Sequence, residues 1–267
     1  MHDDQALTGA IPVISFPRID GRVRAASAIS FEAVCFNQGH AGPELLKDIS
    51  LEVEPGQMVA LTGPAGAGKS CCAHLLRHPW EIAGGAIHLD GRDIRNLSLA
   101  ALNDLVAVVP QACMLRHERL RDNFAFTRPD ASVAELEAAA RQAQVHEAIM
   151  HLPQGYDTPY EAWNERLSAG ERQRVALACA LLKKTPVLVV DETLSALTLT
   201  DERAWQAALM QIRPGRTLLV ISRRLSTLRQ ADWIVVLEQG VVVEEGRHDQ
   251  LMAWHDRYAR LIAAQMA

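Results

Sequence analysis

An octapeptide that begins at Gly63 carries the residue types that wrap a chain of phosphate groups. It reads Gly-Pro-Ala-Gly-Ala-Gly-Lys-Ser and matches the pattern GxxxxGK[ST] at every defined position. Its glycines allow the backbone to curl, so that successive N–H groups point inward at the phosphates. Lys69 would bridge the β- and γ-phosphates of a nucleotide, and the Ser70 hydroxyl would ligate magnesium. The predicted binding loop consists of Gly63, Pro64, Ala65, Gly66, Ala67, Gly68, Lys69 and Ser70.

Two acids that follow an apolar run far down the chain supply the other half of this predicted site. Residues 187–190 are Val-Leu-Val-Val, and Asp191 and Glu192 come directly after them. Because open α/β sheets bind ligands at the carboxyl ends of their strands, we expect these carboxylates near the loop. Asp191 would hold the magnesium directly or through water, and Glu192 would polarise the water that attacks the γ-phosphate. The alternative is that both acids simply cap a helix.

The elements around the loop fit the phosphate-binding interpretation. A strand predicted at 57–62 runs directly into the loop. A helix predicted to begin after Ser70 would point its positive end at the phosphates. A Gly-rich turn that merely contains Lys and Ser is the alternative, and the strand–loop–helix setting argues against it. Cys71 and Cys72 follow the loop on this helix and are expected to pack on the sheet; the alternative for Cys71 is a thiol pKa lowered by the helix start.

Short apolar strands alternate with helices along most of the chain, which predicts an α/β fold with a mainly parallel sheet. Between 112 and 183 apolar residues recur at helical spacing, and Ser132 stands three residues before Glu135 as a capping box, so an inserted helical subdomain is expected there. Residues 1–27 have no sustained period and are expected to be a tail or linker. The other predicted strands are 29–36, 48–54, 85–89, 105–109, 187–190, 217–221 and 233–237, and further helices are predicted near 98–104 and over 247–265.

Composition narrows the class of protein. The chain has 267 residues, 49% of them hydrophobic, and a net charge of -5 without a run of Lys and Arg, so nucleic acid is not expected as a partner. The five cysteines form no paired clusters and indicate core residues in a reducing compartment. The first residues are acidic and do not resemble a secretory signal, and no apolar run approaches the roughly 20 residues that span a bilayer.

A pentapeptide at 167–171 separates one family from other phosphate-loop proteins. It reads Leu-Ser-Ala-Gly-Glu and resembles LSGGQ, the signature of ABC-type ATPases, and Arg-Gln-Arg-Val-Ala-Leu-Ala follows it. From 29 to 265 the chain resembles the ATP-binding domain of an ABC transporter, and its tail from Asp232 is similar to exporter-type members. The resemblance implies a RecA-like P-loop NTPase core with a mainly parallel sheet, an N-terminal antiparallel β subdomain and the helical insert, together forming one domain over 28–267.

The same resemblance implies cofactors and partners. ATP and Mg²⁺ would bind between two subunits arranged head to tail, with Ser168 and Gly170 closing over the γ-phosphate held by the second subunit. Gln111, in the run Val-Pro-Gln, matches the glutamine that senses the metal and couples to a membrane domain. The second subunit would be identical or different, and a transmembrane domain or subunit would be the further partner. The implied location is the cytoplasmic face of the inner (plasma) membrane, where the chain would be peripheral.

Several positions depart from the family pattern. Gln38 stands where an aromatic ring usually stacks on adenine, with Phe36 or His40 as possible substitutes. Arg223 replaces the switch histidine, and arginine can hold phosphate charge but cannot relay a proton. The remaining departures are Ala169 and Glu171 in the signature and Thr198 where the D-loop usually ends in Asp. In a homodimer every departure falls on every site, which predicts slow turnover.

Three hypotheses of function follow. The first is the ATP-hydrolysing subunit or domain of a membrane transporter. The second is a regulatory member that binds ATP and dimerises but scarcely hydrolyses, steadying a more active partner. The third is a non-transport ABC protein of DNA repair or translation, and the acidic balance and the lack of a long coiled-coil insert count against it.

Overall fold

The smaller of two sheets is antiparallel and is formed early in the chain. The computed structural model describes residues 26–39, 42–110, 115, 118–192 and 198–266. The strands of this sheet lie in the order β2-β1-β4-β5. They are β1 (Ile29–Asn37), β2 (Glu44–Val53), β4 (Gly84–Leu89) and β5 (Arg92–Asp93), and every pair runs antiparallel. The prediction of an N-terminal antiparallel β subdomain is confirmed.

The larger sheet has the order β10-β9-β3-β8-β7-β6 and is parallel except at one edge. Its strands are β3 (Met58–Thr62), β6 (Val106–Val109), β7 (Val187–Asp191), β8 (Thr217–Ile221), β9 (Trp233–Glu238) and β10 (Val241–Gly246). β3, β7 and β8 are buried at every residue, as a parallel sheet covered on both faces requires. β10 pairs antiparallel with β9 and was missed by the sequence analysis, because its run Val-Val-Val-Glu-Glu-Gly shows no clear alternation.

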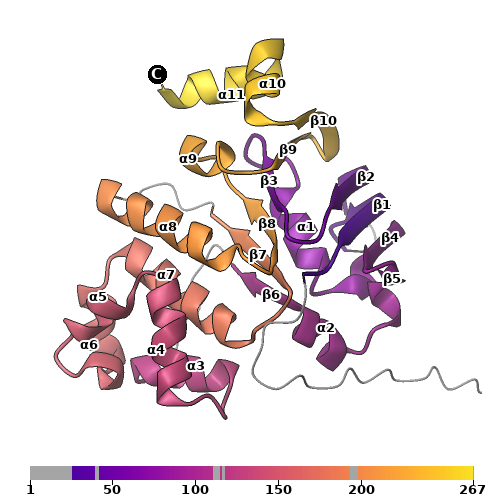
Figure 1. The fold of residues 1–267 in the computed structure, drawn as a ribbon. Coiled ribbons are helices and arrows are strands. Elements are labelled where there is room, and N and C mark those ends of the chain that lie inside the picture. The colour runs from indigo at the N-terminus through magenta and orange to yellow at the C-terminus, as the bar shows by residue number, and fades with distance from the viewer. Residues whose placement is uncertain (1–25, 40–41, 111–114, 116–117, 193–197, 267) are drawn as a thin grey trace, which may run out of the picture.

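Some helices pack on the sheets, and others form a separate group beside β6 and β7, at the lower left of Figure 1. Ser132 and Glu135 begin one of them with the predicted capping box, in which the Ser132 N–H donates to Glu135 at 3.0 Å and the Glu135 N–H donates to Ser132 at 3.3 Å. This group is the expected helical subdomain. Its members are α3 (Leu120–Thr127), α4 (Val133–Gln142), α5 (His146–Met150), α6 (Tyr160–Arg166) and α7 (Ala169–Leu182). The core region carries α1 (Lys69–Leu75), α2 (Leu99–Leu105), α8 (Leu199–Ile212) and α9 (Leu225–Leu228), and single 3₁₀ turns lie at Pro79–Glu81, Ile94–Asn96 and Gly155–Asp157.

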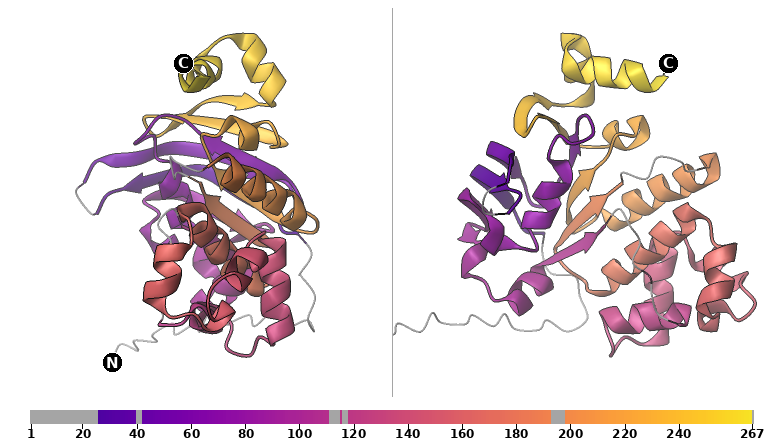
Figure 2. Two further views of the ribbon diagram at one scale, coloured as in Figure 1. Left: turned by 90° about the vertical axis from the view of Figure 1, so that its left-hand side faces the viewer. Right: turned by 180° about the vertical axis from the view of Figure 1, so that it is seen from behind.

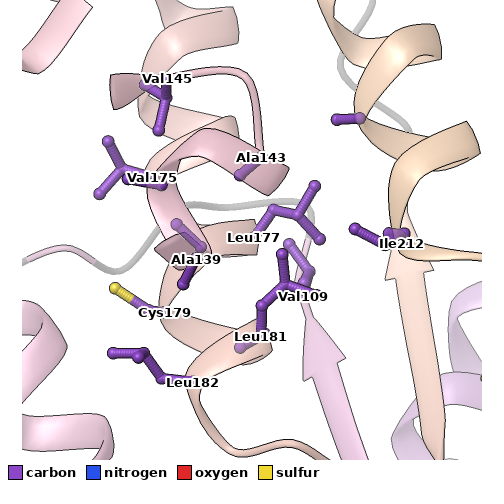
Figure 3. Close-up of a cluster of buried hydrophobic side chains, with 14 of the residues drawn as sticks. Val109, Ala139, Ala143, Val145, Val175, Leu177, Cys179, Leu181, Leu182 and Ile212 are labelled. Carbon is purple, nitrogen blue, oxygen red and sulfur yellow. The ribbon is translucent and has the colours of Figure 1, made fainter. Parts of the chain in front are cut away.

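Helix α7 joins the helical subdomain to the parallel sheet. In Figure 3 its residues Val175 and Cys179 lie on the side of Ala139 from α4, whereas Leu177 and Leu181 lie on the side of Val109 from β6. All six belong to one buried hydrophobic cluster. A helix that packs on two sides at once is apolar around most of its circumference. The signature pentapeptide at the start of α7 is therefore anchored to both parts of the molecule.

The C-terminal segment differs from the prediction of one helix over 247–265. It forms two helices, α10 (His248–Trp254) and α11 (Arg257–Met266), which lie at the opposite end of the molecule from the helical subdomain (Figures 1 and 2). The break falls at His255, whose φ of 55° is left-handed. The Glu244 carboxylate then caps α11 by accepting the N–H groups of Arg257 and Tyr258 at 2.9 and 3.0 Å. Among the described residues we find no helix with the length and apolarity of a membrane span.

Candidate nucleotide-binding site

The predicted phosphate loop and the predicted acids meet at one edge of the parallel sheet. β8 lies between β3 and β7, and the three strands are parallel, so their carboxyl ends are neighbours. The loop follows β3, Asp191 ends β7, and Arg223 lies two residues beyond the end of β8. The carboxyl ends of such strands are where open α/β sheets bind ligands.

The loop adopts a curled backbone that requires glycine. Gly63 has φ 137°, and a Cβ atom there would lie 2.0 Å from the carbonyl oxygen of Leu237. Gly68 has φ 95°, and its Cβ would lie 2.8 Å from the carbonyl oxygen of Leu45. Side chains at these positions would collide with backbone atoms, which cannot move aside as the end of a side chain can. The pattern of glycines therefore follows from the close packing of the loop on β9 and β2.

Lys69 is buried beside the loop and lies close to a second cation. Its Nζ atom donates to the carbonyl oxygens of Gly63 at 2.9 Å and Pro64 at 2.6 Å. Burial lowers the pKa of Lys69, and the positive charge of Arg223 lowers this pKa further, while Asp191 raises it. A bound phosphate would offer the ammonium group an anionic acceptor in place of two carbonyls and would relieve its repulsion by Arg223.

Ser70 and Asp191 lie side by side although they are 121 residues apart in the sequence. The Ser70 hydroxyl donates to a carboxylate oxygen of Asp191 at 2.7 Å. A hydroxyl and a carboxylate are the oxygen ligands that Mg²⁺ accepts together with phosphate oxygens. The pair therefore fits a magnesium ion that bridges the protein and a nucleotide.

A pocket of about 360 Å³ lies over the loop. Arg223, from the segment after β8, also lines this pocket. Cys71 and Leu45 also line it and were not predicted as site residues. Burial raises the pKa of the Cys71 thiol, which fits the expected packing role and not the alternative of a lowered pKa. The full lining is Leu45, Ala65, Gly66, Ala67, Gly68, Lys69, Ser70, Cys71 and Arg223.

Glu192 is placed differently from the other predicted catalytic residues. Its side chain is 2% exposed and does not line the pocket. One carboxylate oxygen accepts the indole N–H of Trp205, and the other accepts the Thr227 hydroxyl at 2.8 Å. Burial raises the pKa of Glu192, while hydrogen bonds from Trp205, Ser222 and Thr227 act in the opposite direction.

The signature residues lie at the first turn of α7 and are tied to α8. Ser168 caps α7 by accepting the N–H of Glu171 at 3.0 Å, and its hydroxyl lies 3.1 Å from the carboxylate of Asp201. A Cβ on Gly170 would lie 2.6 Å from the same carboxyl group. Thr198, the departure at the D-loop, donates to Asp201 at 2.9 Å and caps α8. The unexpected member of this cluster is Asp201, which no sequence pattern singled out.

Two further predictions find no support at the pocket. Gln38 is exposed in the turn after β1, and it does not line the pocket. Phe36 is 8% exposed and packs against the His74 ring, so it offers no open face to an adenine ring. Gln111 and His40 lie outside the described residues.

Comparisons with known proteins identify the family. A family profile described as ABC transporter matches residues 46–195. ATP-binding cassette sub-family B member 6 of Homo sapiens is 43% identical over 231 residues, which cover 86% of this chain and 27% of that protein. The ATP-dependent lipid A-core flippase of Chromohalobacter salexigens is 43% identical over 244 residues, covering 91% and 41% of the two chains.

A solved structure, described as a bacterial Atm1-family ABC exporter with ATP bound, matches with a TM-score of 0.84 and 38% identity, and covers 92% of this chain and 43% of that one. The chain therefore spans less than half the length of these relatives. Its two sheets and helical insert are those of the ATP-binding domain. The chain belongs to the ABC transporter family, in its exporter-like branch.

Proposed function

We propose that this chain binds ATP and Mg²⁺ at the pocket over the phosphate loop and hydrolyses ATP to drive a membrane exporter. The contact of Ser70 with Asp191 beside Lys69 carries the proposal, because it joins a phosphate cradle to a metal-ligand pair. When bound, the magnesium ion would neutralise phosphate charge during transfer. Gln111 is proposed as a further ligand that senses this metal.

Each residue of the site has a role within this proposal. The loop amides and Lys69 bind the β- and γ-phosphates, and Arg223 places a second positive charge at the terminal phosphate. Glu192 accepts a proton from the attacking water once its carboxylate has left the buried position. Gln38 is proposed to lie beside the adenine without stacking on it.

We propose that the working unit is a head-to-tail dimer joined to a transmembrane domain. Ser168 and Gly170, at the start of α7, would then face the γ-phosphate bound by the other subunit. Two relatives support the membrane partner, since one is a flippase and another an exporter, and both are longer than this chain. The proposed location is the cytoplasmic face of the membrane, and no nucleic acid takes part.

Turnover is proposed to be slow. Gln38 and Arg223 weaken the chain's own site, while Ala169, Glu171 and Thr198 act on the site of the partner. A regulatory subunit paired with a more active one is the second candidate, favoured by the buried position of Glu192.

The phosphate loop is tested by Lys69→Ala, which removes the one ammonium group inside the pocket lining. We expect this variant to lose ATP binding, measured by calorimetry, while Lys47→Ala on the exposed side of β2 binds as before. Tight binding by Lys69→Ala would show that the loop is not the phosphate site. Phosphate release by the unmodified chain separates the two candidates, because a rate in the common enzyme range of roughly 1 to 10³ per second excludes slow turnover.

A further inference from the structure

Both oxygens of the Glu192 carboxylate are occupied by neutral donors inside the protein. The Trp205 indole N–H donates to one oxygen and the Thr227 hydroxyl donates to the other at 2.8 Å. Ser222 also acts to lower the pKa of this carboxyl group. With 2% of its surface exposed, Glu192 cannot reach a water molecule in the pocket without giving up these bonds.

The donors are themselves held in place. Trp205 is fully buried on α8, and its indole has a single N–H, which is used entirely on Glu192. Gln206, the next residue on α8, donates to Thr227 at 2.9 Å and to Ser226 at 3.1 Å. The Thr227 hydroxyl oxygen therefore accepts a hydrogen bond from Gln206, and its one proton is donated to Glu192. A fixed arrangement of α8 and α9 thus selects one orientation of the carboxylate.

We propose that Trp205 is a positioning residue that holds Glu192 in a resting orientation outside the nucleotide pocket, and that the base engages only when the Trp205 and Thr227 hydrogen bonds are released. The inference rests on the proposed role of Glu192 in hydrolysis. Trp205 does not line the pocket, so its proposed effect on hydrolysis passes through its bond to Glu192.

The resting orientation is connected to the pocket through the segment between β8 and α9. The Ser222 oxygen accepts the Arg224 N–H at 3.0 Å, and Ser222 also acts to lower the pKa of Glu192. Arg223 stands between Ser222 and Arg224 and lines the pocket. Phosphate charge that draws Arg223 inward would therefore shift the start of α9, the helix that carries the Thr227 donor. Nucleotide binding and release of the base would then be one motion.

Trp205→Phe tests the inference, because it keeps a buried aromatic ring and removes the indole donor, and the control below makes the same change of ring size. We expect kcat for ATP hydrolysis to rise about 3- to 10-fold with KM for ATP unchanged, since one hydrogen bond to a charged group no longer holds the base back. The matched control is Trp163→Phe on α6. Trp163 is 1% exposed, and its indole N–H has no hydrogen-bond partner within the described part of the chain, so kcat should stay as it is. An unchanged or lower kcat in Trp205→Phe overturns the inference.

Thr227→Val provides a second variant should Trp205→Phe fold poorly. It is nearly isosteric and removes the other donor, so kcat should rise in the same direction. A fall in kcat, or a change confined to KM, contradicts the resting orientation.

Glu192→Gln separates this inference from the proposed function. If Glu192→Gln hydrolyses ATP at the original rate, both the proposed role of Glu192 and this inference are contradicted. If Glu192→Gln loses activity but Trp205→Phe has an unchanged kcat, only this inference is contradicted. An independent readout is the indole N–H signal of Trp205 in ¹⁵N–¹H spectra, identified by its absence in Trp205→Phe. We expect this signal to shift in Glu192→Gln while that of Trp163 stays, and an unmoved Trp205 signal would show that the contact is not made.

Discussion

Two cations line the pocket over the phosphate loop, and one carboxylate contacts its edge. Lys69 donates to the loop carbonyl of Gly63, Arg223 also lines the pocket, and Asp191 accepts the Ser70 hydroxyl. The repulsion between the cations contributes to the lowered pKa of Lys69, after burial. A phosphate chain supplies the missing negative charge, so binding of ATP should remove a conflict that the free site retains.

The arginine at the switch position can be tested directly. In Arg223→His the imidazole is mostly neutral above pH 7 and can relay a proton, which arginine cannot do. We expect a higher kcat together with a KM for ATP that is raised several-fold, because a fixed charge on the phosphates is lost. Steady-state phosphate release measures both. Arg229→His makes the same change at an exposed site outside the pocket and should alter neither.

Among the elements, the turn from β3 into α1 depends on backbone approach rather than on side-chain chemistry. Gly63 and Gly56 both have positive φ, at 137° and 81°, but only at Gly63 would a Cβ atom meet another backbone group. The two positions separate the conformational cost of a side chain from the steric cost.

We expect Gly56→Ala to lower the free energy of unfolding by about 1 to 2 kcal/mol, which is the cost of a left-handed residue with a Cβ. Gly63→Ala should cost about 3 kcal/mol or more and should also abolish ATP binding, because the loop must move away from Leu237. Urea unfolding and calorimetry measure the two effects. Equal losses in both variants would show that the loop accommodates a side chain.

The first turn of α4 is tied to the ends of its neighbours through Glu135. This carboxylate contacts Arg128 at 2.5 Å and Lys184 at 2.8 Å, and these partners hold the pKa of Glu135 far below its usual range. A carboxyl group with a depressed pKa in the folded state adds stability above the unfolded pKa of about 4.3, and this stability is lost as pH falls through the folded pKa.

Glu135→Gln should therefore unfold at lower urea concentration than the unmodified chain at pH 7, and the difference should shrink as the pH falls below about 4. High salt should shrink it too, because the three side chains are partly exposed. Glu137→Gln, whose partner Arg141 lies one turn along the same exposed helix face, is the control and should change little at any pH. A difference that grows with acid would contradict the assignment.

For the whole molecule, one buried ion pair connects the helical subdomain to the core. Arg174 on α7 donates to the carbonyl oxygen of Gln144 at 3.1 Å and to the carboxylate of Asp201 on α8 at 3.0 Å. The Asp201 carboxylate also accepts the Ser168 hydroxyl and lies close beside Gly170, so the same carboxylate positions the signature residues.

Removing one partner of a buried pair leaves the other charge without compensation, which costs about 3 to 5 kcal/mol. Arg174→Met should therefore lose about this much stability in urea unfolding, and amide exchange in α7 and α8 should accelerate. Arg203→Met on the exposed face of α8 should stay within about 0.5 kcal/mol of the unmodified chain. A small loss of stability in Arg174→Met would mean that hydrophobic packing alone joins the helical subdomain to the core.

Features that depend on neighbouring residues could be predicted from the amino-acid sequence. The glycines from Gly63 to Gly68, the strand into Asp191 and the cap at Ser132 each follow from a short pattern, because turn geometry, strand burial and helix caps are local. The meeting of Ser70 with Asp191 was also predictable, since parallel strands end at the same edge of a sheet.

The remaining features depend on contacts between segments that are distant in the chain. The break at His255 uses a left-handed residue that is not glycine, and β10 exists because β9 offers an edge to pair with. The orientation of Glu192 depends on Trp205, 13 residues on, and on Thr227, 35 residues on. Such partners meet through the packing of separate helices on a sheet, and a pattern of residues along the chain carries no record of which side chains that packing brings into contact.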